Sequence, residues 1–436
     1  MIKLPQERKQ QILVVASMYV GYACFMILRT IPTVAGNAML DDPSLDIDKE
    51  VWGRVVAAGT CGGIVGKFLF AWMADKLGGK FTFTLGLLLT LIAVVVFAAG
   101  SSAWFFGGVL FVALMTKSSG WPSMAKLIGH WFQPKEHGRV WGTLATSSRV
   151  GTIIATFCLG ALLAVLSWRW LLVASGGIAG VVVLWCAVML RERPERAAAS
   201  DDGLVETESE LDAPHFLDGT TLPQAIRVFA RTPRFWLITG SLMGLTILWD
   251  FLAFVQIYLK ETLDISPAEA SMASSAFPAG SLISVLCGGY VFDMLSRGRM
   301  AVVMGVLLTL ATGCVLSFYL IPSWNLDSNS AAYLSVGLLF VFGLCVSPCY
   351  YIPMSVFSIE FGGIHSGFLI ALLDALGFGA AALFYYFAGG WAEQSWSLFF
   401  AALLVVAVWS LLTTFCFLLN ESRYQASVPE PTGGGD

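Results

Sequence analysis

The sequence is poor in charged residues and carries none of the common catalytic motifs. Only 12% of its 436 residues are Asp, Glu, Lys or Arg, about half the share found in soluble globular domains. It has no GxSxG elbow, no HExxH zinc motif and no phosphate-binding GKS/T loop. It also lacks the basic domain or basic tail that is typical of nucleic-acid-binding proteins. We therefore expect neither an enzyme nor a nucleic-acid-binding protein, and no cofactor.

Paired cysteines are also missing. Nine cysteines occur, almost all of them inside apolar runs, and none forms a CxxC pair. Cysteines in such surroundings are usually small buried hydrophobic residues. We therefore expect no disulfide bond and no metal site.

Long apolar runs fill most of the chain. Hydrophobic residues make up 57% of it, and the mean hydropathy is +0.76. A membrane-spanning helix needs about 20 apolar residues, and the first run has no small-residue cleavage site, so we expect it to be retained. Twelve runs qualify: 12–36, 51–75, 80–100, 104–129, 139–166, 168–190, 235–258, 268–294, 299–321, 331–356, 363–388 and 396–420. The sequence therefore predicts an all-α membrane protein with twelve transmembrane helices.

One long polar stretch divides these spans into two sets of six. It runs from residue 191 to 234 and has an acidic centre, a composition typical of a mobile linker. We therefore expect a six-helix bundle at 1–190, a cytoplasmic linker at 191–234, a second six-helix bundle at 235–422 and a disordered tail at 423–436.

Basic residues gather in alternate loops and so indicate an orientation. Cytoplasmic loops of membrane proteins carry an excess of Lys and Arg. The N-terminal segment and every second loop after it hold bases such as Lys76, Lys135 and Arg299, whereas the first loop between them is acidic. We expect both termini in the cytoplasm, in a multi-pass protein of the inner membrane.

The two halves repeat one motif. Residues 71–80 read AWMADKLGGK after the second span, and residues 289–299 read GYVFDMLSRGR after the eighth. Both resemble the GxxxDxxGRR signature of the major facilitator superfamily, although Ala71 stands where that family usually has glycine. The resemblance implies two pseudo-symmetric bundles that rock around a central site.

The same motif suggests a conformational latch. Its carboxylates, Asp75 and Asp293, can cap a neighbouring helix or pair with the basic residues Lys80 and Arg297. The alternative is a charged turn that only obeys the orientation rule for basic loops.

A closer resemblance begins in the fourth span. The segments are GWPS at 120–123, HWF at 130–132, KEHG at 135–138 and YLKE at 258–261. Together they are similar to segments of the organophosphate:phosphate antiporters. That family implies exchange of a phosphorylated metabolite for inorganic phosphate.

The residues of that family carry over only in part. By this resemblance, members of the family bind phosphate with one arginine on the first helix and one on the seventh. Arg29 matches the first position, but the second falls near Leu248, where the nearest charge is the acid Asp250. Lys67 matches a lysine of the second helix, and Ser147 stands where the fifth helix has a histidine. These departures put a mechanism with two symmetric arginines in doubt.

Charged residues in the middle of spans are the most informative feature. They are costly to insert, by about 2.5–3.5 kcal/mol each on insertion scales, and by default indicate function. By resemblance, all of them lie on helices that line a central cavity. The N-terminal half holds the bases Arg29, Lys67, Lys117 and Arg149, and the C-terminal half holds the acids Asp250 and Asp374.

Four bases against two acids predict an anion pocket in the N-terminal half. Arginine binds carboxylate or phosphate in a fork, and lysine adds a point charge. Tyr22 and Trp121 are candidates to line the pocket, or they serve packing alone. Structural alternatives remain for the bases themselves. Lys67 can pair with Asp374 across the halves, and polar groups of the eighth helix can hold Arg149.

The two acids suggest coupling to protons. A carboxylate near a movable cation can exchange protons as the site opens and closes, so Asp250 and Asp374 are candidate proton carriers. Their alternative role is to hold the bases while the cavity is empty. A third is to bind the cationic end of a zwitterion.

These observations predict a secondary transporter that takes up a small organic anion with protons by alternating access. Polycarboxylates, citrate-like chelators and phosphorylated metabolites all fit the charge. Alternatives are organophosphate/phosphate exchange, a transporter-like membrane sensor and a zwitterion transporter. We expect a monomer in the lipid bilayer. Prolines 122, 278, 348 and 353 predict kinks near the pathway.

Overall fold

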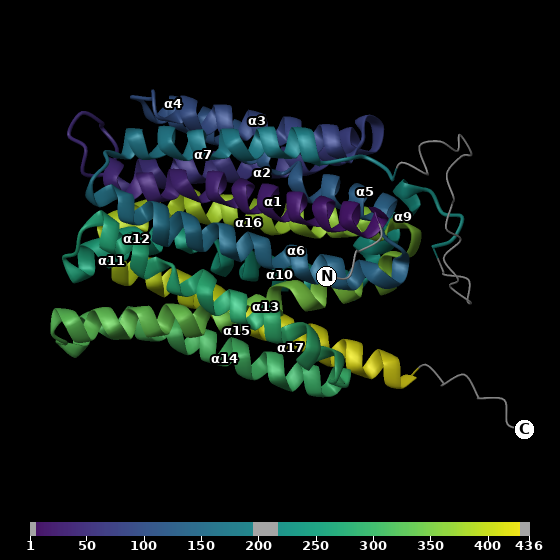
Figure 1. Ribbon diagram of the computed structural model, residues 1–436. Helices are drawn as coiled ribbons and strands as arrows, with labels where there is room; N and C mark the ends of the chain where they lie inside the picture. Colours follow the sequence, from purple (N-terminus) through teal and green to yellow (C-terminus); the bar gives the residue numbers. More distant parts are fainter. Residues whose placement is uncertain (1–5, 195–216, 428–436) are drawn as a thin grey trace, which may run out of the picture.

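The computed structural model describes residues 6–194 and 217–427, and every regular element in these ranges is helical. The long helices lie side by side in one bundle (Figure 1). The first half comprises α1 (Gln6–Met39), α2 (Lys49–Leu77), α3 (Gly79–Phe97), α4 (Ala103–Lys117), α5 (Gly120–Trp131), α6 (Pro134–Ile153), the π-helix η1 (Ile154–Leu159), the short η2 (Leu162–Ala164) and α7 (Trp168–Met189).

The second half follows the same plan. It comprises α9 (Leu222–Arg231), α10 (Pro233–Asp250), α11 (Leu252–Leu263), α12 (Pro267–Ser274), α13 (Ala276–Asp293), α14 (Arg297–Leu320), η3 (Ile321–Trp324), α15 (Ser328–Gly362), η4 (Gly363–His365), α16 (Ser366–Gln394) and α17 (Trp396–Ser427).

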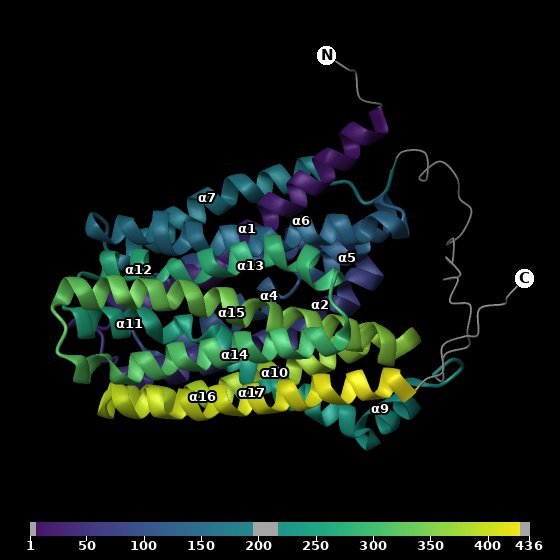
Figure 2. The same ribbon diagram turned by 90° about the horizontal axis from the view of Figure 1, so that it is seen from below.

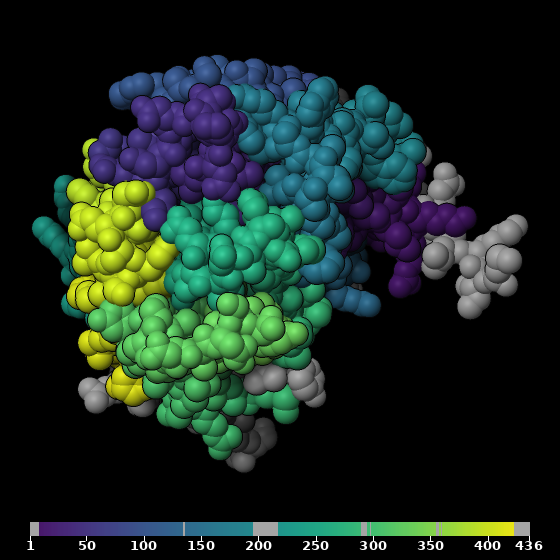
Figure 3. All heavy atoms as spheres, turned by 90° about the vertical axis from the view of Figure 1, so that its left-hand side faces the viewer, coloured from purple at the N-terminus to yellow at the C-terminus, as the bar shows by residue number. Residues whose placement is uncertain are grey.

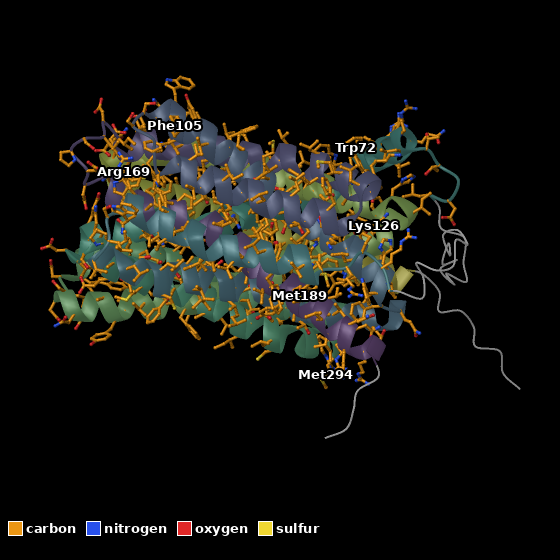
Figure 4. The ribbon with its side chains drawn as sticks, turned by 45° about the horizontal axis from the view of Figure 1, so that its top comes forward. Trp72, Phe105, Lys126, Arg169, Met189 and Met294 are labelled. Carbon is orange, nitrogen blue, oxygen red and sulfur yellow. The ribbon has the colours of Figure 1, made fainter. Side chains whose placement is uncertain are left out.

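The described helices account for the twelve predicted spans. Eleven are long and apolar enough to cross a membrane, and α10 with α11 forms a twelfth that is bent by 42°. Large apolar side chains such as Trp72 and Phe105 lie on the outside of the bundle (Figure 4), where a membrane protein contacts lipid. The predicted all-α fold with twelve spans is confirmed.

Three spans depart from regular α-helix near their middle, and the seventh, which bends by 42°, is the one that is sharply broken among the described residues. In the fourth span α4 ends at Lys117 and α5 begins at Gly120, with a turn between them. The seventh breaks after Asp250, and the fifth passes from α6 into η1 four residues after Arg149. Each irregularity therefore lies at or close to a predicted mid-span charge. Discontinuous helices at this depth are typical of transporter binding sites.

Glycines clamp helices together within each half. A Cβ atom at Gly62 or Gly66 of α2 would collide with backbone of α4, and one at Gly280 of α13 with backbone of α15. Gly343 of α15 makes the reciprocal approach to α13. The second and fourth spans of each half are thus held backbone to backbone, as expected for repeated halves.

The bundle has two distinct ends. The beginning of α1, the whole of α9 and the end of α17 lie at one end, which we call the terminal end (Figures 1 and 2). The turns that follow α1, α11 and α16 lie at the other, the distal end. Both ends of the described chain therefore lie on the same side, as an even number of spans requires. Which side faces the cytoplasm stays a prediction.

Part of the predicted linker is a helix. Thr221 and Gln224 form a capping box that begins α9, and the buried Phe229 packs against Phe361 with ring centroids 5.6 Å apart. The acidic centre of the linker and the last nine residues of the predicted tail lie outside the described residues.

Candidate anion-binding site between the halves

Arg29 of α1 and Asp250 of α10 form an ion pair that joins the two halves. The Arg29 Nη2 and Asp250 Oδ1 atoms are 2.5 Å apart, and the side chains are 20% and 13% exposed. Both residues lie in the middle part of their spans. The base and the acid therefore neutralise each other at the boundary between the bundles.

Lys67 of α2 and Asp374 of α16 form a second ion pair across the halves. The Tyr350 hydroxyl donates a 3.1 Å hydrogen bond to the other carboxylate oxygen, and the Lys67 ammonium lies 4.4 Å from the centre of the Phe378 ring. The pairing considered from the sequence is thus present. Both mid-span acids hold bases in this conformation, and neither is free to receive a cationic group.

Arg149 of α6 is held without an acid. It is 4% exposed, and its Nε donates a 3.2 Å hydrogen bond to Ser281 of α13, in the eighth span as expected. Its Nη1 donates to the Ala145 carbonyl at 3.0 Å and to the Ser148 hydroxyl at 2.6 Å. Within the described residues its Nη2 has no hydrogen-bond partner. One buried N–H donor group of this guanidinium therefore has no hydrogen-bond partner among the described residues.

An aromatic wall from the C-terminal half faces that guanidinium. Its carbon Cζ lies 4.4 Å from the centre of the Tyr351 ring and 5.2 Å from that of Trp249. Trp249 in turn stacks on Tyr350 at 5.7 Å. Cation–π contacts of this kind stabilise a desolvated cation by about 2 kcal/mol or more, but they leave its charge uncompensated.

Lys117 is the second base without an acid. It is the last residue of α4, at the turn in the fourth span, and its Nζ lies 5.8 Å from the centre of the Tyr22 ring. Among the described side chains no carboxylate lies within ion-pair distance of it. Two of the four bases are therefore paired with the two mid-span acids, and Arg149 and Lys117 are left without an acidic partner among the described side chains.

The predicted aromatic residues join the site on its terminal side. Tyr22 and Trp121 are in contact, with ring centroids 5.6 Å apart, and Trp121 packs on Trp141 at 4.4 Å. Tyr22 is buried, whereas Trp121 is 44% exposed. The three rings thus lead from the mid-span bases toward the terminal end.

Ser147 does not reach the site in this conformation. It is fully buried, and its hydroxyl donates to the Leu144 carbonyl at 2.6 Å. One turn later on the same face, a Cβ atom at Gly151 would collide with the Ala23 backbone. This face of α6 therefore packs against α1, and Ser147 is a packing residue here rather than a ligand.

Ion pairs that the sequence analysis did not identify close the distal end. Lys49 of α2 pairs with Glu261 of α11 at 2.9 Å, and Lys260 pairs with Asp41 at 2.6 Å. The Trp396 indole also donates to Glu261 at 2.8 Å. We call these contacts the distal lock. In Figure 3, which views this end, the two halves meet along one continuous boundary.

The predicted latch differs from expectation at the terminal end. The Asp75 side chain is 76% exposed, and its carboxylate lies 3.9 Å from the Lys126 ammonium. Figure 4 shows Lys126 near the terminal end. Glu192 takes the expected capping role: it accepts hydrogen bonds from the backbone N–H groups of Gly79 at 2.9 Å and Lys80 at 2.7 Å. In this conformation Glu192 caps α3, and the latch role of Asp75 stays a prediction.

The second copy of the latch lies outside the described side chains. This applies to Asp293 and Arg297, whose pairing stays a prediction.

The fold and the charged boundary define a class of membrane transporter built from two six-helix bundles. A sequence model described as Major Facilitator Superfamily matches residues 13–255. The chain belongs to this family, which consists of transporters rather than enzymes.

Curated relatives support the resemblance to organophosphate antiporters. A probable hexose phosphate transport protein of Chlamydia muridarum is 25% identical and covers 91% of this chain and 88% of its own. The membrane sensor protein UhpC of Escherichia coli is 23% identical over 95% and 93%. The glucose-6-phosphate exchanger SLC37A2 of Xenopus tropicalis is 22% identical over 86% and 81%. The predicted resemblance is confirmed.

Solved structures of other transporters share the fold. A bacterial homologue of the human lysosomal transporter Spinster, in its inward-facing and unoccupied conformation, aligns with a TM-score of 0.71 at 15% identity and covers 97% of this chain and 99% of its own. The nucleoside transporter NupG aligns with a TM-score of 0.66 at 14% identity, over 93% and 98%.

Proposed function

We propose that this chain is a secondary transporter that exchanges small phosphorylated metabolites for inorganic phosphate by alternating access. One observation carries the proposal. Beside two ion pairs that join the halves, the buried guanidinium of Arg149 and the ammonium of Lys117 have no acidic partner among the described residues. Such a site attracts an anion.

The charge of a phosphate monoester fits this site. It carries about −1.5 to −2 charges near neutral pH, and full ionisation of the six mid-span groups leaves a surplus of two positive charges. The unused Nη2 of Arg149 is a donor suited to a phosphate oxygen. Arg149 also supplies a base beside Trp249, next to the position where the family resemblance expects its second arginine and this chain has Leu248.

The names of the relatives favour phosphorylated cargo over the other anions. From charge alone, polycarboxylates and citrate-like chelators fit as well. The relatives named for a hexose phosphate and for glucose-6-phosphate align over most of their length with most of this chain. We therefore place phosphorylated metabolites first and exchange ahead of the uptake with protons predicted above.

Exchange follows from the cost of moving an empty site. A buried base without a counter-ion is unfavourable, by several kcal/mol per ion in principle. With the anion bound, the surplus charge is neutralised as the halves rock past each other. The loaded protein should therefore change conformation faster than the empty one, which is the condition for exchange.

Reconstituted vesicles test this proposal. Purified protein in liposomes should take up labelled glucose-6-phosphate rapidly when the vesicles are preloaded with inorganic phosphate, and slowly when they contain only chloride. The R149Q variant should lose at least tenfold of this uptake, because hydrogen bonds to a charged group contribute about 1.5–3 kcal/mol. Equal uptake into both kinds of vesicle would rule out exchange. Normal uptake by R149Q would rule out the site.

A membrane sensor is a second candidate. It is favoured by the alignment with UhpC, a relative named as a sensor, over 95% of this chain. A sensor would bind glucose-6-phosphate, measured as a rise in the melting temperature of the purified protein, without measurable flux in phosphate-loaded vesicles. Binding together with flux favours the transporter.

A further inference from the structure

The helix α9, at the terminal end, has an apolar face that the rest of the protein covers only in part. Ala225 and Phe229, four residues apart, are fully buried against the bundle. Leu222 and Ile226, also four residues apart, are each 38% exposed. At about 3.6 residues per turn, these two pairs lie next to each other on the helix surface. The apolar face of α9 is therefore wider than its contact with the bundle.

The opposite face of α9 is basic. Arg227 and Arg231 are both exposed and lie one helical turn apart. Among the described residues neither has an ion-pair partner. The nearby Arg234 of α10 differs, because it pairs with Glu421 of α17 at 2.5 Å. Two guanidinium groups on α9 are thus available to an anionic partner.

The contacts of α9 indicate its depth in a membrane. Figure 2 shows α9 at the terminal end, where it projects sideways beyond α17. Trp236, near the start of α10, is 57% exposed, and its indole donates a 2.8 Å hydrogen bond to the Ala230 carbonyl of α9. Tryptophans at the ends of membrane spans are typical of the headgroup level. The end of α9 is therefore held at the level of the lipid headgroups.

We propose that α9 is an interfacial helix that binds anionic phospholipids of the leaflet at the terminal end. Its exposed apolar residues, Leu222 and Ile226, contact the acyl chains near the headgroups, and Arg227 and Arg231 bind the lipid phosphates. Helices with one apolar and one basic face lie in the membrane interface in this way. The inference is independent of the proposed cargo, because it concerns a different surface of the protein.

The chemistry of the two arginines favours an anionic lipid. A guanidinium binds phosphate oxygens through two parallel hydrogen bonds. Residues four apart on a helix have Cβ atoms about 5–6 Å apart, so Arg227 and Arg231 can share one headgroup or bind two. Phosphatidylcholine carries a cation that compensates its phosphate, whereas phosphatidylglycerol keeps its negative charge. We expect each arginine to favour phosphatidylglycerol by about fivefold.

A soluble acidic partner accounts for less of this surface. It would neutralise Arg227 and Arg231, but it would leave Leu222 and Ile226 exposed to water. A phospholipid contacts both faces of α9 at once, because its phosphate and its acyl chains lie at adjacent depths of the leaflet. The combination of the two faces therefore selects the lipid.

Native mass spectrometry of the full-length protein in detergent tests the inference. The protein is titrated with phosphatidylglycerol or phosphatidylcholine, and the dissociation constant of the most tightly bound lipid is measured. The native protein should prefer phosphatidylglycerol by about 25-fold, the product of two fivefold contributions. R227Q/R231Q should lower this preference to less than about threefold. R227K/R231K should keep most of it, because lysine retains the charge.

Two further measurements test the apolar face. L222Q/I226Q should weaken the binding of both lipids, because less apolar surface is left for the acyl chains. Glycerophosphoglycerol, the soluble headgroup without acyl chains, should not displace phosphatidylglycerol at equal concentration. Displacement by this headgroup would mean that the arginines bind a free anion, and it overturns the inference.

A matched control removes two exposed arginines that lie outside α9. R139Q/R193Q lowers the net charge by the same amount as R227Q/R231Q and should keep the native lipid preference. An equal loss of preference in both double variants would show a general effect of charge and overturns the inference. So does an unchanged preference in R227Q/R231Q. Each of these outcomes leaves the proposed transport of phosphorylated metabolites in place.

Discussion

Two layers of ion pairs join the halves, and they differ in the exposure of their carboxylates. In the distal lock the carboxylates of Asp41 and Glu261 are 56% and 35% exposed, whereas in the central layer no partner exceeds 21%. Exposed ion pairs stabilise a protein by about 0–1 kcal/mol. Breaking a buried pair by removing one partner costs about 3–5 kcal/mol. The distal lock can therefore open readily, while the central layer needs a replacement charge such as the cargo.

The largest expected effect comes from removing one partner in the central layer. D250N leaves Arg29 buried without its acid and should destabilise the protein by about 3–5 kcal/mol. A thermal-shift measurement on the purified protein should show a clearly lower melting temperature.

The double variant R29Q/D250N is the control for this prediction. It removes both charges and should recover much of the lost stability. If the double variant is less stable than D250N, Arg29 has a stabilising partner other than Asp250, and the central layer does not behave as a pair.

A smaller effect is expected from the hydroxyl of Tyr350. Y350F removes one hydrogen bond to Asp374 and should cost about 1.5–3 kcal/mol, because the acceptor is a charged group. The Lys67–Asp374 pair itself stays in place. The measurement is again the melting temperature, with Y351F as a matched control that keeps the ring and alters no hydrogen bond to the acid. Equal losses in both variants would contradict the assigned role.

The smallest effect is expected at the distal lock. K260A removes the pair with the exposed Asp41 carboxylate and a 3.2 Å hydrogen bond to the Asn37 carbonyl, and it should change stability by about 0.2–1 kcal/mol. This difference should vanish when the salt concentration is raised from about 0.01 to 1 M, because the Debye length falls from about 30 to 3 Å. The loss caused by D250N should persist at high salt. A salt-independent effect of K260A would remove the contrast between the two layers.

Much of this arrangement follows from the sequence because it depends on local properties. Hydropathy alone indicates the twelve spans, and a charge in the middle of an apolar run needs a partner or a polar chamber. For this reason the pairing of Lys67 with Asp374 and the contact of Arg149 with the eighth span were both predictable.

The positions of helix irregularities and the contacts between distant segments were not predictable in the same way. The expected kinks at Pro348 and Pro353 do not interrupt α15, whereas the fourth span has a local turn after Lys117 and the seventh bends by 42° after Asp250. Hydropathy does not register such breaks because the apolar run continues through them. Likewise, the capping of α3 by Glu192 joins residues more than 110 positions apart, so no local sequence motif predicts it.

The backbone contacts at Gly62, Gly66, Gly280 and Gly343 have a consequence for motion. Because the backbones of these helices touch without intervening side chains, we expect little bending inside each half. Each half should therefore move as a rigid body. Any relative displacement of the two halves is then concentrated at the boundary between them. A single methyl group added at one of these glycines would therefore disturb the motion of the whole half and not only the packing around that residue.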